Sequence, residues 1–240
     1  MLGLVVAEAA VETVPERLWL HPAIVNYAKK LGKPASEVLL DRSYHHSAMC
    51  LLEDHLKRGR PDIAHFALLE ALGSPLNSEG LLETYVHTYC DYAISVNAEA
   101  KLPRNYDRFT GLIEQLFKLG RVPPRGEALL KLEHLGLPQL VKKISPSHIL
   151  AFSRKGKPQT LEKTLSKLQD KERLVVLVGG FPHGTFTKTA LKLADEVVSL
   201  DAEMLETWTV VSRVIYEYER SIGLPERRLA LKKSLEKSIF

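Results

Sequence analysis

The chain has 240 residues, of which 45% are hydrophobic and 26% charged, a composition normal for a globular protein with a full core. Its 33 Lys and Arg against 29 Asp and Glu give a net charge of +4, which permits a polyanionic partner without requiring one. Two isolated cysteines, Cys50 and Cys90, exclude a disulfide framework and a thiolate zinc site, and we assign a metal to none of the nine histidines.

The sequence favours a protein of the reducing cytoplasm. The apolar amino terminus lacks a basic start and is broken by Glu8, so we do not expect a secretion signal. No stretch approaches the roughly 20 apolar residues that cross a membrane.

The first half of the chain alternates apolar runs with helical patterns. We predict strands at 2–7 and 38–40 and helices at 22–31, 48–56 and 61–73. This alternation is typical of a parallel sheet covered by helices. Two further runs, 81–88 and 92–96, predict an antiparallel hairpin appended to that sheet, and a helix follows over 109–117.

The second half continues the pattern after an irregular stretch. Residues 120–147 are rich in Pro and Gly, and we interpret them as a linker. Beyond them we predict strands at 148–153, 174–178 and 195–200 and helices at 160–168, 190–193, 205–222 and 226–240. The stripe Trp208, Val211, Ile215 and Tyr218 indicates a core face or a subunit interface.

The run Leu174-Val-Val-Leu-Val-Gly-Gly-Phe-Pro-His-Gly184 reads as a buried strand that stops on two glycines. Gly179 and Gly180 have no Cβ to keep a ligand away from the main chain, so we expect a cofactor there. An ordinary strand-to-helix turn is the alternative use of the same glycines. Neither G-x-G-x-x-G nor G-K-[ST] is present, so both nucleotide-binding fingerprints fail.

Basic residues precede or open two of the predicted helices. Arg60 and Asp62 suit an ion pair at one helix start. Lys101, Arg104 and Arg108 follow each other at intervals of three and four residues, where cations oppose the helix dipole. A phosphate shared by these side chains and the free N–H groups would explain their placement, whereas a solvated basic edge is the alternative.

Five blocks of the chain resemble one known family. They are Leu40-Asp-Arg-Ser-Tyr-His-His46, Gly59-Arg-Pro-Asp-Ile-Ala-His-Phe66, Pro103-Arg-Asn-Tyr-Asp-Arg-Phe-Thr-Gly-Leu112, Val178-Gly-Gly-Phe-Pro-His-Gly184 and Trp208-Thr-Val-Val-Ser-Arg-Val-Ile-Tyr-Glu-Tyr-Glu219. Together they are similar to the ribosome-biogenesis methyltransferases of the SPOUT class, the nucleolar essential protein family, which act on N1 of pseudouridine. The match runs through nearly the whole chain, and the short termini look like the archaeal form.

The resemblance implies an α/β fold in which a parallel sheet is flanked by helices and the carboxy-terminal part is tied in a deep trefoil knot. Residues 1–240 would form one domain, with 74–120, a β-hairpin and helix extension, as an RNA-binding insertion. A homodimer is also implied. Knotted chains are rare exceptions to the threading rule, so periodicity by itself would suggest an open Rossmann-like sheet.

The resemblance also implies the residues of two sites. S-adenosyl-L-methionine would meet, mostly through main-chain contacts, Ser153, Gly179, Gly180, Leu200, Asp201, Ala202, Glu203, Met204 and Leu205. RNA would meet Arg60, Lys101, Arg104 and Arg108, with Asp62 holding Arg60. Lys101 stands where we expect arginine in relatives, and its point charge loses bidentate recognition of phosphate. Asp62 either positions Arg60 or acts as a general base, and pairing with a guanidinium favours the first role.

The implied activity is transfer of a methyl group from S-adenosyl-L-methionine to N1 of a pseudouridine in small-subunit ribosomal RNA. The implied partners are that RNA, a second copy of the chain and, as further candidates, ribosomal assembly proteins. Two alternatives stay open: an RNA-binding assembly factor whose methyl transfer is secondary or absent, and a metabolite-binding α/β enzyme unrelated to RNA.

Overall fold

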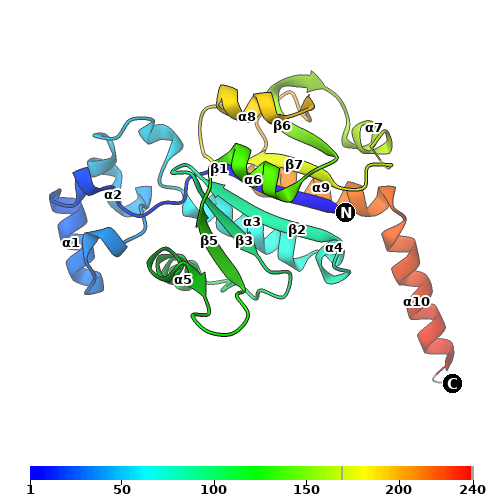
Figure 1. Cartoon of the computed structure of the whole chain (residues 1–240), viewed down its shortest axis with the longest axis horizontal. Coiled ribbons are helices and arrows are strands. Elements are labelled where there is room, and N and C mark those ends of the chain that lie inside the picture. Colours follow the sequence, from blue (N-terminus) through cyan, green and yellow to red (C-terminus); the bar gives the residue numbers. More distant parts are fainter. Residues whose placement is uncertain (169, 239–240) are drawn as a thin grey trace.

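The computed structural model describes residues 1–168 and 170–238, and its centre is an eight-stranded sheet (Figure 1). The strands lie in the order β4-β5-β3-β2-β1-β7-β6-β8. Their bounds are Leu2–Ala9 (β1), Leu82–Thr88 (β2), Tyr92–Val96 (β3), Arg121–Val122 (β4), Leu130–His134 (β5), His148–Pro158 (β6), Leu174–Gly179 (β7) and Glu196–Ser199 (β8). Five adjacent strands run parallel to one another: β2, β1, β7, β6 and β8. At the β2 edge of this group, β3, β5 and β4 add antiparallel pairs.

Helices cover both faces of the sheet, which is why β1 is apolar at every position that faces them. Leu4 and Val6 lie in one core, with side chains of α3, α5 and α9, and Val5 and Ala7 lie in another, with side chains of α6 and α8. The helices are Pro22–Leu31 (α1), Arg42–Met49 (α2), Pro61–Gly73 (α3), Pro75–Ser78 (α4), Tyr106–Leu119 (α5), Leu137–Ile144 (α6), Leu161–Ser166 (α7), Lys188–Leu193 (α8), Thr207–Ser221 (α9) and Leu224–Ser238 (α10).

Two parts of the chain lie away from the sheet. Helices α1 and α2 pack around their own core of Leu18, Ile24 and Leu40 and form a lobe beside one end of the sheet (Figure 1). Helix α10 projects from the body (Figure 1), and the predicted helix 226–240 matches it up to residue 238, with 239–240 outside the described residues. Within the described residues no helix is long and apolar enough to span a membrane.

The parallel sheet, the hairpin of β2 and β3 and the bounds of α1 confirm the sequence predictions. The predicted strand 38–40 is wrong. Val38 and Leu40 are instead buried in the small lobe, and their main chain bonds to residues 12–14, with a single bridge between Thr13 and Leu39. The helical pattern over 48–56 is also wrong, because α2 ends at Met49.

The interpretation of 120–147 as a linker is wrong as well. This segment supplies β4, β5 and α6, and Leu130, Leu137 and Leu140 are buried. Two of its three glycines flank helices: Gly120 ends α5 with φ 74°, and Gly136 precedes α6. A Pro-rich and Gly-rich composition here marks the ends of short elements in one continuous sheet.

The apolar stripe of α9 is mainly core. Val211, Ile215 and Tyr218 are buried against the sheet and α3, whereas Tyr216, on another face of the same helix, is exposed. The predicted stripe therefore belongs to the inside of the chain, and a subunit contact would have to use a different face of α9.

Strand β6 crosses β8 at very short range. It leaves register with β8 after Phe152 and regains it at Lys157. Between these residues, a Cβ on Gly156 would lie 2.5 Å from the carbonyl carbon of Val198. Only glycine, which has no Cβ, fits such a close approach of two main chains, so this crossing requires glycine at position 156.

Candidate functional site

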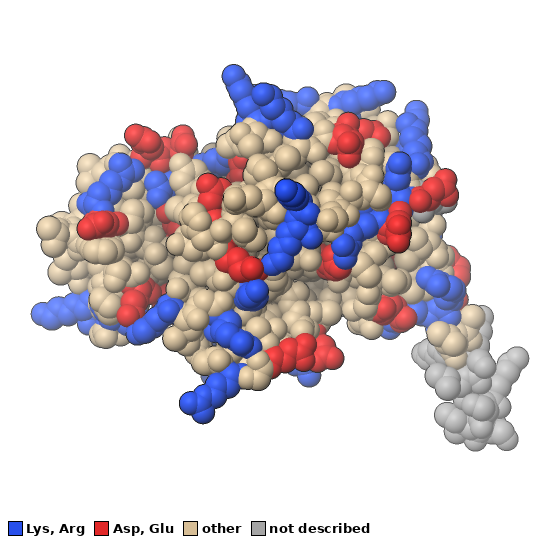
Figure 2. Space-filling view, in the orientation of Figure 1, with Lys and Arg blue, Asp and Glu red and all other residues tan. Residues whose placement is uncertain are grey.

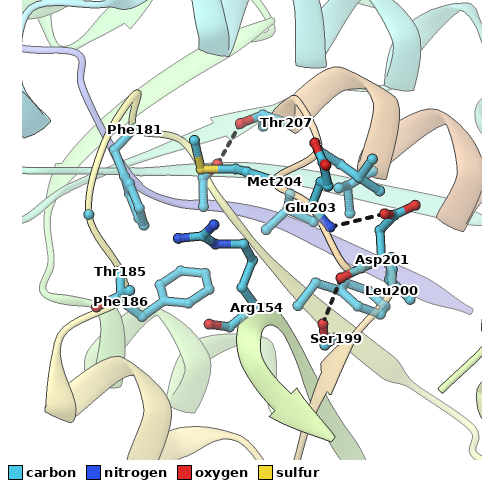
Figure 3. A pocket seen from close by; sticks show the side chains of 17 residues that line it. Arg154, Phe181, Thr185, Phe186, Ser199, Leu200, Asp201, Glu203, Met204 and Thr207 are labelled. Carbon is cyan, nitrogen blue, oxygen red and sulfur yellow. Dashed lines mark hydrogen bonds between the residues drawn. The ribbon is translucent and has the colours of Figure 1, made fainter. Parts of the chain in front are cut away.

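A cavity of about 110 Å³ lies at the carboxyl ends of β7 and β8, beside the part of β6 that leaves register (Figure 3). Open α/β sheets bind ligands at the carboxyl ends of their strands. The walls are mostly apolar and include Phe152, Val178, Phe181, Phe186, Leu200, Met204, Leu205 and Val210. The charged lining residues are Arg154, Asp201 and Glu203.

The structure brings most of the predicted cofactor residues to this cavity. Those that line it are Ser153, Gly179, Leu200, Asp201, Glu203, Met204 and Leu205. The other two predicted cofactor residues are Ala202 and Gly180. Both lie in the described part of the chain, and neither lines the cavity.

The two glycines at the end of β7 have different surroundings. A Cβ on Gly179 would lie 2.9 Å from ring atoms of Phe181, which is a cavity wall. A Cβ on Gly180 would lie 2.7 Å from the Val6 side chain and 2.8 Å from the Cα of Ala9. The missing side chain of Gly180 therefore permits close packing against β1, which is a second reason for glycine at this position beside the predicted contact with a ligand.

Internal hydrogen bonds hold the loop after β8. The Ser199 hydroxyl donates to the Asp201 carbonyl at 3.1 Å, and the Glu203 N–H donates to Asp201 Oδ1 at 3.0 Å (Figure 3). The Thr207 hydroxyl donates to the Gly179 carbonyl at 2.6 Å and so ties the start of α9 to the end of β7. The loop that lines the cavity is thus shaped by bonds within the protein.

A buried carboxylate, Glu8, holds the loop that follows β7. It accepts from the N–H of Thr187 at 3.0 Å and from its hydroxyl at 2.6 Å, and it forms an ion pair with Lys57. The Lys57 ammonium also donates to the Thr185 carbonyl at 3.0 Å and lies 4.2 Å from the centre of the Phe181 ring. Thr185 and Phe181 line the cavity, so Lys57 supports its wall.

Glu8 and Lys57 were not predicted as site residues. Glu8 has φ 52°, a left-handed conformation that is uncommon outside glycine, and it is 5% exposed. A single carboxylate within an otherwise apolar strand is the signal that could have found it, because a buried charge requires partners.

Arg60 and Asp62 form a bidentate ion pair at the start of α3. Arg60 Nε donates to Asp62 Oδ1 at 2.8 Å and Nη2 donates to Oδ2 at 2.7 Å. The bond to Asp62 is the main cause of a raised pKa of Arg60, with the nearby charge of Glu206 a smaller one. The main chain of Arg60 donates to Ala10, whose own N–H donates to Gly180. This pair is therefore tied to the end of β7.

The predicted basic residues near α5 are exposed: Lys101, Arg104 and Arg108. Within the described part of the chain their side chains have no ion-pair partner. Basic and acidic side chains alternate over the face drawn in Figure 2, without one large basic patch. We refer to these three residues, together with Arg60, as the basic surface.

Hydrogen bonds fix the segment that carries the basic surface. His65 of α3 bonds through Nε2 to the Pro103 carbonyl at 2.7 Å, and because a carbonyl can only accept, Nε2 carries the proton. Burial lowers the pKa of His65. The hydroxyl of Tyr106 donates to Asp41, and Asn105 caps α5 by accepting from the Arg108 N–H at 3.0 Å. The loop before α5 is thereby held against α3 and α2.

The described residues contain no cluster of three or more His, Cys, Asp or Glu side chains that could hold a metal ion. The chemistry that the site offers is therefore that of an apolar cavity with carboxylates and one guanidinium, next to an Arg and Asp pair. Such a site suits a nucleoside-like ligand with polar substituents.

Comparisons with known proteins agree on one family. The family model of EMG1/NEP1 methyltransferases matches residues 4–219. The ribosomal RNA small subunit methyltransferase Nep1 of Thermococcus kodakarensis is 45% identical over 227 residues, which are 93% of this chain and 100% of the relative. The protein of the same name from Thermococcus onnurineus is 46% identical over 222 residues, 91% of this chain and 98% of the relative.

A solved structure is similar over the same range. The crystal structure of Archaeoglobus fulgidus Nep1 bound to S-adenosylhomocysteine superposes with a TM-score of 0.82 at 39% identity. The match covers 92% of this chain and 98% of the other. Because sequence and fold agree over nine tenths of its length, this chain belongs to the EMG1/NEP1 methyltransferase family.

Proposed function

We propose that this protein transfers a methyl group from S-adenosyl-L-methionine to N1 of a pseudouridine in small-subunit ribosomal RNA during small-subunit biogenesis. Family membership supports methyl transfer, and the relatives named as small-subunit rRNA methyltransferases support the RNA. The observation that carries the proposal is the cavity at the strand ends, with the Arg60 and Asp62 pair linked through the main chain of Ala10 to Gly180, directly after β7.

The residues of the cavity fit S-adenosyl-L-methionine, whose reaction product occupies the related crystal structure. Apolar walls suit the adenine ring, and the carboxylates of Asp201 and Glu203 suit hydroxyl and ammonium donors. Ser153, Gly179 and the loop 200–205 would hold it. When bound, it supplies a methyl group on a positively charged sulfur.

The protein's part in the reaction is to orient the target base and exclude water. Bringing two reactants together in the right orientation accounts for much of an enzyme's rate gain. Both oxygens of Asp62 already accept from the Arg60 guanidinium, and taking up the N1 proton would weaken this charge-assisted pair. We therefore assign Asp62 to positioning Arg60, with general-base catalysis as the alternative.

We assign RNA binding to the basic surface. Lys101, Arg104 and Arg108 are exposed cations that suit phosphate contacts, and Arg60 is held by Asp62 beside them. The target nucleotide would have to be unstacked to reach the cavity. The insertion 74–120 would contribute mainly its loop before α5, because β2 is a strand of the sheet itself. Residues 1–240 would act as one domain.

The close crossing at Gly156 and Val198 supports a deep trefoil knot in the carboxy-terminal part, as in the SPOUT class. The long β6 pairs with β7 and twice with β8, as a chain threaded between them would. An experimental structure whose chain could be pulled straight from both ends would contradict the knot.

We also propose a two-fold homodimer. Its support is two exposed aromatic side chains on helices that pack together, Phe66 of α3, 48% exposed, and Tyr216 of α9, 58% exposed. An isologous contact doubles such a face against its symmetry mate. Light scattering should give twice the 26.9 kDa chain mass, and a monomer at micromolar concentration would contradict the dimer.

A cytoplasmic location and contacts with ribosomal assembly proteins are part of the same proposal. The free cysteines Cys50 and Cys90 agree with a reducing compartment. Fractionation of cells would test the location, and recovery in a membrane or secreted fraction would contradict it.

The experiment that tests the function mixes the purified protein with labelled S-adenosyl-L-methionine and one of two matched loop RNAs, containing uridine or pseudouridine at one position. We expect label only in the pseudouridine RNA. Tight RNA binding without transfer would favour the second candidate, an assembly factor, because the exposed cations of the basic surface serve that role equally well. Label in both RNAs would place the methyl group on another atom.

A further inference from the structure

Arg154 is the one cation among the described residues that line the cavity. It follows Ser153 in the part of β6 that leaves register with β8. Figure 3 shows its guanidinium pointing into the cavity, between the rings of Phe181 and Phe186. Sequence reasoning did not select Arg154, because no periodicity tells which way a side chain points from an irregular segment of a strand.

Arg154 differs from Arg58 and Arg60, whose guanidinium groups both have ion-pair partners. Arg58 pairs with Glu12 and Arg60 pairs with Asp62, each through two nitrogen atoms. Within the described residues Arg154 has no ion pair. Arg154 is exposed and lines the open side of the cavity. A guanidinium presents a planar fork of N–H donors that matches a carboxylate or a phosphate, so one that faces a ligand cavity without an ion pair suits an anionic ligand group.

Among the residues that the structure describes, neither carboxylate of the lining, Asp201 or Glu203, forms an ion pair with Arg154. Asp201 accepts from the Glu203 N–H and so stabilises its own loop, and both side chains come from the segment after β8. In Figure 3 they lie on the opposite side of the cavity from the Arg154 guanidinium. The cavity therefore has a positive side and a negative side.

We propose that Arg154 binds the carboxylate of the methionine part of the cofactor. This inference rests on the proposed function. The cofactor carries one anionic group, its carboxylate, and two cationic groups, its ammonium and its sulfonium. The charges of the cavity complement them: the carboxylate pairs with Arg154, and the cationic groups face the side of Asp201 and Glu203. Arg154 thereby selects the complete amino-acid cofactor over nucleosides that lack a carboxylate.

The test is titration calorimetry with two ligands that differ in one group. S-adenosylhomocysteine carries the carboxylate, and its decarboxylated analogue, S-adenosyl-3-thiopropylamine, lacks it. Arg154→Ala should weaken binding of S-adenosylhomocysteine about 10- to 100-fold, the usual effect of losing a charge-assisted hydrogen-bond pair. The same change should alter binding of the analogue less than about twofold. Arg154→Lys, which keeps the charge, should fall between the wild type and Arg154→Ala.

Lys155→Ala is the matched control. Lys155 is exposed on the same segment and is not part of the cavity lining, so its loss should leave both affinities unchanged. Equal unfolding temperatures of all variants show that the fold is kept, and Arg154→Lys tests the proposal even if Arg154→Ala is unstable.

Three results would overturn the proposal. An equal loss for both ligands would mean that Arg154 packs against the nucleoside. Unchanged affinity for S-adenosylhomocysteine together with weaker RNA binding would assign Arg154 to an RNA phosphate. If the wild-type protein bound neither ligand, the proposed function itself would fail, a result separate from a wild type that binds both ligands while Arg154→Ala leaves both affinities unchanged.

Discussion

The cavity and the basic surface are neighbours that are built in different ways. The cavity is shaped by loops whose main chain is hydrogen-bonded in place, as at Gly179 and Asp201, and its walls are largely apolar. The basic surface depends on charged side chains, of which Arg104 is exposed and Arg60 is half-buried. We infer that the cavity is sensitive to changes that move the main chain, whereas the basic surface is sensitive to the loss of single charges.

The ion pair of Glu8 and Lys57 connects the two regions, and its loss should have the largest effect. Lys57 lies three residues before Arg60 and contacts the cavity loop at Thr185 and Phe181. Lys57→Met leaves the buried Glu8 carboxylate without its cation, which should cost about 3–5 kcal/mol of stability. Thermal unfolding measures this cost, and both cofactor and RNA affinity should fall.

The double variant Glu8→Gln with Lys57→Met separates two effects of Lys57→Met. One is the cost of burying an unpaired carboxylate, and the other is the loss of the contact between the two regions. The double variant removes the unpaired carboxylate, so we expect it to recover part of the stability while both affinities stay low. Full recovery of both affinities in the double variant would show that the pair only stabilises the fold and does not connect the two regions.

The next prediction concerns the basic surface alone. Arg60→Ala should lower methyl transfer roughly 100-fold, because truncating one member of a bidentate charge pair also leaves the other unpaired. Asp62→Asn should show a similar loss, and the double variant should be little worse than either single change. Affinity for S-adenosylhomocysteine should stay at the wild-type value in all three.

Arg104→Ala is the control, because it removes one charge of the basic surface and leaves the Arg60 and Asp62 pair intact. It should weaken RNA binding and reduce the slope of log affinity against log salt by about one unit. If the losses of methyl transfer in Arg60→Ala and Asp62→Asn added up in the double variant, this double-mutant cycle would argue against the positioning role of Asp62. Recovery of Asp62→Asn activity at high pH, with RNA affinity unchanged, would instead favour the general base.

The sequence predicted the centre of the sheet better than its edge. Strands β1 and β7 are buried on both faces and so read as unbroken apolar runs, whereas β4 and β5 are short and lie among residues rich in Pro and Gly. An edge strand needs fewer apolar residues, so its pattern is weak. The family resemblance predicted seven residues that line the cavity, of which five lie in the loop after β8, Gly179 ends β7 and Ser153 lies in β6.

The residues that the sequence did not predict act through long-range contacts. Glu8 meets Lys57 49 positions later and Thr187 179 positions later, and neither separation leaves a periodic signal. The same holds for Gly180, whose absent side chain is explained by the neighbouring strand. The apolar run and its two glycines predicted one edge of the cavity and the family resemblance predicted the loop 200–205, but neither predicted the side chains that hold these loops.

The smallest expected effects come from the two glycines at the end of β7, and they test whether the cavity is governed by its main chain. Gly180→Ala places a Cβ 2.8 Å from the Cα of Ala9, which cannot move without shifting β1. We expect a loss of about 1–3 kcal/mol of stability, measured by denaturant unfolding, with cofactor affinity largely kept in the folded fraction. Gly179→Ala places its Cβ 2.9 Å from the ring of Phe181, a side chain that can rotate. Because that ring is a cavity wall, this variant should keep its stability and lose affinity for S-adenosylhomocysteine. If Gly180→Ala instead lost cofactor affinity at unchanged stability, Gly180 would belong to the ligand site and the structural reason given for it would be wrong.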